Sequence, residues 1–182
     1  KLRIVTALKA NGDIVAMTFG HAHFAGTRDH KGTNIESGIG YPICCEPFRV
    51  YESNAWYSRH CGTGDTQGNP YWWVIPNYFD VSEWDLGTAP RKYLLYFGRI
   101  IQSKGLDVVK EIARSRPDVD VLLCGQGDPS PWLAPEWPNL KHVGVRAGRE
   151  RSALLGGAIA LLTPTQYFEP FGGVTVEANL CG

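Results

Sequence analysis

The second half of the chain alternates short apolar runs with stretches whose apolar residues recur at helical spacing. Four apolar runs predict buried strands, at residues 93–97, 119–124, 140–145 and 158–163. Three stretches predict helices, at residues 106–113, at residues 149–155 and from residue 174 onward. Strands that alternate with helices in this way predict βαβ units, and therefore a parallel sheet with right-handed crossovers. In such sheets, ligands bind beyond the carboxyl ends of the strands.

The first half of the chain predicts mainly strands and turns. Apolar and β-branched residues gather in four predicted strands, at residues 2–8, 14–19, 33–39 and 71–75. A helix is predicted over residues 47–61, because Pro47 suits a first helical turn and Trp56 and Tyr57 give the segment an apolar side. These patterns predict three parts: an N-terminal domain, a linker of mixed charge and a C-terminal domain, at residues 1–80, 81–91 and 92–182.

The most informative segment is the end of the chain, from Pro164 to Glu177. An apolar run leads into it, a Gly-Gly pair lies inside it, and helical spacing follows. A strand that passes through a loop into a helix presents unpaired backbone N–H groups, which favour an anion. Glu169 precedes the helix and Glu177 lies about one turn inside it, so two carboxylates could flank one ligand. Because carboxylates accept hydrogen bonds from hydroxyls, the segment suits a molecule with phosphate and hydroxyl groups, such as a nucleotide sugar.

Charge and hydropathy argue against two broad classes of protein. The chain has 18 Lys plus Arg and 18 Asp plus Glu, and a formal net charge of zero argues against a general nucleic-acid binder. No apolar stretch approaches the ~20 residues that span a bilayer, and no signal-peptide pattern is present. The chain begins with Lys1 rather than Met, so we expect its natural start to be absent.

The cysteines are irregularly spaced, at Cys44, Cys45, Cys61, Cys124 and Cys181. This spacing is typical of free thiols in a reducing cytoplasm. A zinc site is the alternative, built from Cys44, Cys45, His60 and Cys61. The adjacent Cys-Cys and His-Cys pairs lack the usual C-x2-C spacing of such sites.

Four segments resemble motifs of one known family and stand in the order that the family has. Glu169-Pro-Phe-Gly-Gly-Val-Thr-Val-Glu177 resembles the E-x7-E motif of retaining GT-B glycosyltransferases, in particular the large family four. Tyr93 to Arg99, followed by Lys104-Gly105, resembles the strand, G-R and K-G of that family. Val121 to Gly127 resembles its next strand and G-x-G turn. Val74 to Asp80 resembles the V-I-P-N-G-V-D segment that joins its two domains.

The resemblance implies an α/β fold of GT-B type with two Rossmann-like parallel-sheet domains. Both domains are expected to be incomplete, because the opening Gly-rich loop and the last strands and closing helix of the family are missing, so we expect a fragment. The implied activity is metal-independent transfer, with retention of configuration, of a sugar from a nucleotide-diphosphate sugar to a hydroxyl of a carbohydrate or other acceptor. No cofactor is implied beyond this donor substrate. We expect a cytoplasmic protein; peripheral association with a membrane and the oligomeric state stay open.

The resemblance also assigns roles to residues of the second domain. Arg99 and Lys104 would bind the donor diphosphate and stabilise it as it leaves, although such a pair alone more simply flanks a solvated loop. Glu169 would orient the donor sugar and Glu177 would hold the ribose hydroxyls, where the alternative is two solvated positions. The remaining donor-binding positions are Gly98, Phe171, Gly172 and Gly173.

Other candidate positions have more than one interpretation. Gly125 and Gly127 form either a tight turn near the nucleotide base or an ordinary turn at a strand end. His21 and His23 contact the donor sugar, have a structural role or bind a metal. The Gly-rich segment at residues 36–41 contacts the acceptor or is a turn. Cleft lining or a helix-surface ion pair is predicted for three residues on one side of a helix: Arg49, Glu52 and Trp56.

Two other functions stay open at this point. The missing elements would suit a non-catalytic binding or assembly module derived from a glycosyltransferase. A sugar-nucleotide epimerase of related GT-B shape would use the same donor without an acceptor.

Overall fold

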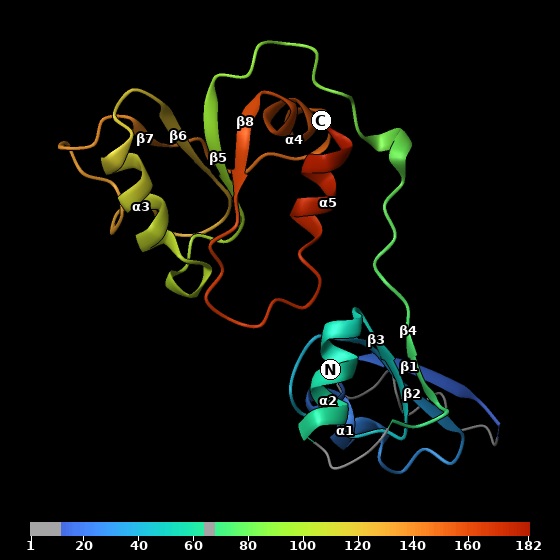
Figure 1. The fold of residues 1–182 in the computed structure, drawn as a ribbon. Helices are drawn as coiled ribbons and strands as arrows, with labels where there is room; N and C mark the ends of the chain where they lie inside the picture. The colour runs from blue at the N-terminus through green and yellow to red at the C-terminus, as the bar shows by residue number, and fades with distance from the viewer. Residues whose placement is uncertain (1–11, 64–67) are drawn as a thin grey trace. The chain divides into compact units, whose positions relative to one another are not determined.

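The computed structural model describes residues 12–63 and 68–182 of the chain. The chain divides into two compact units, Lys1–Asn77 and Tyr78–Gly182, and each unit contains one parallel sheet (Figure 1). The strand predicted at residues 2–8 lies outside the described residues.

Unit 1 is built on a parallel sheet with the strand order β1-β2-β3-β4. Its strands are β1 Ile14–Thr18, β2 Thr33–Ile39, β3 Phe48–Tyr51 and β4 Trp72–Val74. Its helices are α1 Gly20–Thr27 and α2 Asn54–Thr63. Ile39, Tyr41, Tyr51 and Trp56 form a cluster of buried side chains in this unit.

The helix predicted over residues 47–61 is wrong in its first part, which is strand β3. The aromatic and β-branched residues of this segment suit a pleated surface, and parallel pairing with both β2 and β4 binds their backbone. Arg49, Glu52 and Trp56 therefore do not share one side of a helix, because Arg49 lies in β3. The Arg49 guanidinium lies over the ring of Trp72, 4.5 Å from its centroid.

Helix α1 is an element that the apolar pattern does not predict. Only Gly20 and Thr27 of its residues are buried, so no apolar stripe marks it in the sequence. His21 and His23 therefore lie on a helix that directly follows β1.

Glu36 is a fully buried carboxylate in β2, and it ties three segments of unit 1 together. It accepts hydrogen bonds from Tyr41 Oη at 2.9 Å and from the backbone N–H groups of Cys45 at 2.8 Å and Glu46 at 3.1 Å. Tyr41 Oη in turn accepts a hydrogen bond from the N–H of Gly20, at the start of α1. Strand β2 confirms the strand predicted at residues 33–39. Contact of the segment at residues 36–41 with an acceptor stays a prediction.

We expect Glu36→Ala to lower the free energy of unfolding of unit 1 by about 3 kcal/mol or more, because three donors that are buried or partly buried lose their acceptor. Urea unfolding followed by tryptophan fluorescence measures the change. Asp29→Ala is a suitable control, since this carboxylate belongs to a side chain that is 82% exposed, and its effect should stay below about 0.5 kcal/mol. Equal effects of the two substitutions would contradict the anchoring role.

Unit 2 contains a second parallel sheet, with the strand order β7-β6-β5-β8. Its strands are β5 Tyr93–Phe97, β6 Asp120–Cys124, β7 Leu140–His142 and β8 Ala158–Leu162. Its helices are α3 Leu106–Ser115, α4 Gly148–Gly156 and α5 Gly173–Leu180. The strands and helices predicted for this half are confirmed, although β7 is shorter than the predicted residues 140–145.

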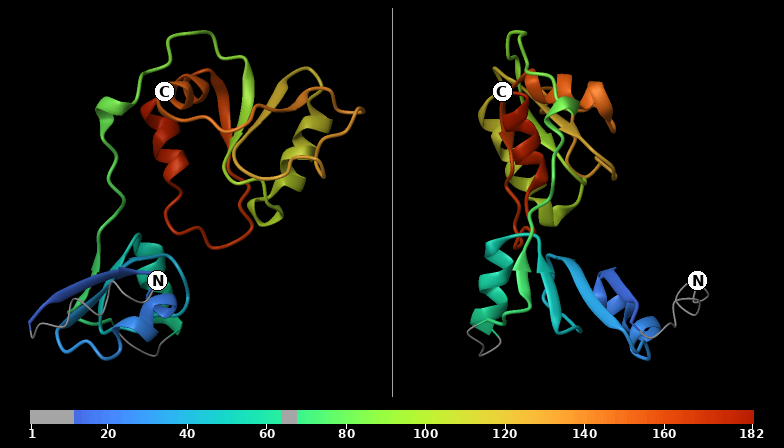
Figure 2. Two further views of the ribbon diagram at one scale, coloured as in Figure 1. Left: turned by 180° about the vertical axis from the view of Figure 1, so that it is seen from behind. Right: turned by 90° about the vertical axis from the view of Figure 1, so that its right-hand side faces the viewer.

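Helices cover both faces of the sheet in unit 2. Neighbouring residues of a strand point to opposite faces, so Tyr96 packs in a cluster with Val109 of α3 whereas Leu95 packs with Leu155 of α4. Figures 1 and 2 show α3 on one side of this sheet and α4 and α5 on the other. This is the layered arrangement of a doubly wound α/β domain. Among the helices that the structure describes, none is long and apolar enough to cross a membrane.

Candidate functional site

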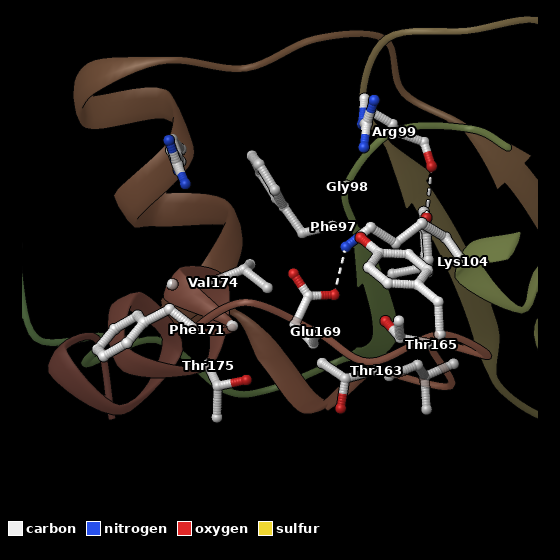
Figure 3. A pocket seen from close by; sticks show the side chains of 16 residues that line it. Phe97, Gly98, Arg99, Lys104, Thr163, Thr165, Glu169, Phe171, Val174 and Thr175 are labelled. Carbon is white, nitrogen blue, oxygen red and sulfur yellow. Dashed lines mark hydrogen bonds and ion pairs between the residues drawn. The ribbon is translucent and has the colours of Figure 1, made fainter. Parts of the chain in front are cut away.

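A cavity of about 590 Å³ lies in unit 2, beside the ends of β5 and β8 and the start of α5 (Figure 3). The position agrees with the rule that ligands of parallel sheets bind beyond the carboxyl ends of the strands. The sequence-predicted residues that line it are Gly98, Arg99, Lys104, Glu169, Phe171, Gly172 and Gly173. Polar lining residues that the sequence did not single out include Tyr96, Arg151, Thr163, Thr165, Tyr167 and Thr175.

Arg99 follows β5 and brings an uncompensated positive charge to the cavity. Its backbone carbonyl accepts a hydrogen bond from Tyr96 Oη at 2.6 Å, which fixes the chain just after the strand. Within residues 12–63 and 68–182, no carboxylate lies within ion-pairing distance of its guanidinium. An unpaired guanidinium in a concave, partly enclosed site is suited to bind an anion.

Lys104 is paired with Glu169 inside the cavity. Its Nζ donates a hydrogen bond to Glu169 Oε2 at 2.6 Å and lies 4.8 Å from the centroid of the Tyr167 ring (Figure 3). Burial disfavours the charged ammonium, but the hydrogen bonds to Glu169 and Tyr167 and the negative charge of the Glu169 carboxylate outweigh it, so the pKa of Lys104 is raised. Lysine therefore stays charged at neutral pH, and its charge is neutralised locally by Glu169.

The K-G pair has a steric basis in the structure. Gly105 has a left-handed backbone with φ of 79° and begins helix α3. A Cβ atom at this position would lie 2.0 Å from the carbonyl oxygen of Pro164, in the segment that follows β8. Only glycine allows this approach, which brings the Lys104 loop against the loop that carries Glu169.

The start of α5 forms another part of the cavity wall. Gly172 precedes the helix in a left-handed conformation, and no side chain caps the first turn. The first backbone N–H groups of a helix without a side-chain cap are available to a ligand, and the helix dipole favours an anion there. The Phe171 ring stacks on that of Phe79, with centroids 6.1 Å apart, and this contact supports the loop before Gly173.

Glu177 does not line the cavity itself. Its side chain is 9% exposed, and its Oε2 accepts a hydrogen bond from Arg151 Nη2 in α4. Its partner Arg151 does line the cavity. The sequence places Arg151 in a predicted helix, but no spacing shows that this residue would meet Glu177 on a different helix.

The two glycines of the G-x-G turn also lie outside the cavity lining. A Cβ atom on Gly125 would approach the carbonyl oxygen of Gly98 to 1.8 Å, so this glycine allows the chain after β6 to pack against the chain after β5. Gly127 makes an isolated parallel bridge with Ile100 in the same region. Both glycines thus allow the chain after β6 to pack against residues 98–100, the segment that carries Arg99.

His21 and His23 belong to unit 1 and are not among the residues that line the cavity. Both are exposed on α1. The ring of His21 meets the edge of the Tyr41 ring, with centroids 5.6 Å apart, and His23 Nδ1 contacts the carbonyl oxygen of Thr18. Their role in donor binding stays a prediction.

The cysteines of the chain are free, and two of the residues considered for a zinc site are neighbours. His60 Nε2 donates to the carbonyl of Tyr41, so its Nδ1 is an acceptor and receives the Cys44 thiol at 3.5 Å. Burial and the charge of Glu36 raise the pKa of Cys44 to about 12, which keeps the thiol neutral. Over the part of the chain that the structure describes, no group of three or more His, Cys, Asp or Glu side chains could hold a metal ion.

His60 is expected to make the stability of unit 1 depend on pH. Burial lowers the pKa of His60 below its ordinary value, so the unfolded chain takes up a proton at a higher pH than the folded one. The stability that the neutral, buried His60 contributes is therefore complete above about pH 6.5 and decreases as the pH falls below that value. Urea unfolding at pH 7.5 and 5.5 should show this loss, and His60→Gln should reduce the difference. An unchanged difference in the variant would assign the pH dependence to other groups.

Comparisons with known proteins identify the fold. No protein-family model matches the chain, and no curated protein sequence matches it significantly. Among solved structures, HepE (Alr3699) of Anabaena, in complex with UDP and glucose, has a TM-score of 0.78 at 18% identity and is matched over 98% of this chain and 59% of its own. AviGT4, a glycosyltransferase involved in avilamycin A biosynthesis, has a TM-score of 0.71 at 23% identity over 98% of this chain and 56% of its own. TarM has a TM-score of 0.72 at 13% identity over 99% of this chain and 42% of its own.

The chain has an α/β fold of GT-B type. The similarity extends over both parallel-sheet units, because nearly the whole chain is matched. The chain spans about half the length of the solved structures that it resembles. At these identities the similarity establishes the fold alone, so the function has to be argued from the site.

Proposed function

We propose that unit 2 binds a nucleotide-diphosphate sugar, and that the chain acts in the transfer of this sugar to an acceptor hydroxyl. One observation carries the proposal: Arg99, which has no carboxylate partner among the described residues, shares a cavity with Glu169 and with the uncapped start of α5. A cation and free helix amides suit a diphosphate, and a carboxylate suits sugar hydroxyls. The GT-B fold, which the chain shares with known glycosyltransferases, supports this activity by analogy.

The arrangement supports a mechanism in which the protein itself stabilises the leaving group. Arg99, Lys104 and the first amides of α5 would bind the diphosphate as the bond between the sugar and its oxygen breaks. The acceptor oxygen forms its bond to the same sugar carbon from the same face, which retains the configuration, and its proton passes to the departing phosphate. Because protein cations supply the positive charge, we propose that no metal ion is required. Glu169 would hold the sugar for this attack, as the family resemblance implies.

Calorimetry with UDP, UDP-glucose and GDP-mannose, followed by product analysis with and without EDTA, tests the proposal. UDP is the first nucleotide to try, because HepE was solved with UDP and glucose. Saturable binding and sugar transfer that persists in EDTA are expected. Conversion of the donor without an acceptor would support the epimerase instead, and binding without any turnover would support a binding module. Absence of all nucleotide binding would overturn the proposal.

The proposed site of action is the cytoplasm. The five cysteines are free, which suits a reducing compartment. Sedimentation with lipid vesicles would decide whether the chain also associates with a membrane surface.

A further inference from the structure

Arg151 is held by contacts with three different segments of unit 2. Its Nη2 donates a hydrogen bond to Glu177 of α5. Its guanidinium lies 4.9 Å from the ring centroid of Phe97, at the end of β5, and 5.4 Å from that of Trp84. A planar cation that stacks on two aromatic rings has little freedom to reorient.

The contact with Arg151 fixes the orientation of the Glu177 carboxylate, which is almost completely buried. The Glu177 side chain is 9% exposed, whereas that of Arg151 is 31% exposed and lines the cavity. A buried carboxylate without a partner is strongly unfavourable, so the orientation of Glu177 depends on the guanidinium that meets it. The bond uses Oε2, which leaves Oε1 for a ligand hydroxyl.

Arg151 also retains hydrogen-bonding capacity of its own. Its Nε is buried and has no hydrogen-bond partner among the described residues. Three cations line the cavity: Arg99, Lys104 and Arg151. Lys104 and Arg151 are each paired with a glutamate. The pairing separates the three cations by role: Arg99 is free for an anion, and the charge of Arg151 is committed to Glu177.

We propose that Arg151 is a positioning residue, which holds the Glu177 carboxylate in the orientation that receives the ribose hydroxyls of the nucleotide. This inference rests on the proposed function, in which Glu177 binds the ribose. The guanidinium engages one carboxylate oxygen and fixes the plane of the group before the ligand arrives. A lysine would supply the charge but not the planar fork, so its orientation of Glu177 would be poorer.

The test compares the affinities for UDP and 2′-deoxy-UDP by calorimetry, since only a ribose contact distinguishes the two. The wild-type chain should prefer UDP by about tenfold, the effect of one hydrogen bond to a charged group. Glu177→Gln and Arg151→Gln should each reduce this preference to within about twofold, and the double variant should reduce it no further. Arg151→Lys should give an intermediate preference. If the guanine or adenine diphosphate binds more tightly, it and its 2′-deoxy form replace the uracil pair.

Control variants and distinct outcomes separate this inference from the proposed function. Arg149→Gln removes an exposed arginine from the same helix and should leave the preference unchanged. Thermal unfolding of each variant verifies its folding, and Arg151→Lys decides the question if Arg151→Gln does not fold. An unchanged preference in the folded Arg151 variants overturns the positioning role, including the case in which both nucleotides lose affinity equally. Failure of the wild-type chain to bind any of these nucleotides overturns the proposed function, and with it this inference.

Discussion

Arg99→Ala is expected to lower kcat/KM for the nucleotide sugar by about 10²–10³-fold, because the group that stabilises the departing diphosphate is lost. The other two cations of the cavity cannot replace it, since Lys104 is paired with Glu169 and Arg151 with Glu177. The affinity for UDP should fall as well, because the diphosphate is present in both donor and product. Donor turnover and calorimetry with UDP measure the two effects.

A matched control for this prediction is available on helix α3. Arg114 has a side chain that is 63% exposed and pairs with Glu111, away from the cavity lining. Arg114→Ala should leave turnover and UDP affinity unchanged. Arg99→Lys should recover part of the activity, because it restores the charge without bidentate contact. If Arg99→Ala and Arg114→Ala behaved alike, the cavity would not be the donor site.

Glu169→Gln is expected to change sugar transfer and nucleotide binding in opposite directions. Transfer should slow by about a hundredfold or more, because the donor sugar loses the carboxylate that orients it. The Lys104 ammonium, however, loses the ion pair at 2.6 Å that offsets its charge, and its attraction for the diphosphate becomes stronger. The affinity for UDP should therefore be unchanged or increased, and calorimetry beside a transfer assay shows both effects.

Unfolding of the variant would lower both sugar transfer and UDP affinity, so it cannot produce slower transfer with unchanged or increased affinity. Glu111→Gln, at a side chain that is 61% exposed, serves as the control and should leave both measurements unchanged. A large loss of UDP affinity in Glu169→Gln would mean that the carboxylate supports the nucleotide rather than the sugar. The proposed division of roles between Lys104 and Glu169 would then be wrong.

The sequence by itself determined the architecture of unit 2 and most of its cavity. Long-range contacts were not needed, because the apolar runs and helical periods are regular there and three of the strands, β5, β7 and β8, are each followed by a helix. Once the strands are parallel, their carboxyl ends lie at one edge, and residues that directly follow them are brought together. Arg99, Lys104 and Glu169, which follow β5 and β8, line one cavity for this reason.

Only the tertiary structure decided which charged residues pair and which segments of unit 1 are strands. Glu177 and Arg151 lie on separate helices, and their contact depends on how α4 and α5 pack, which no local spacing encodes. Strand β3 has four residues and would suit a helix as well, so its conformation is set by pairing with β2 and β4. Glu36 is a charged residue that the sequence does not mark as buried, yet it is fully buried, because donors from the irregular segment between β2 and β3 fold back onto it. In each case the deciding free energy comes from partners outside the element itself, and the hydrophobic period of that element does not reveal them.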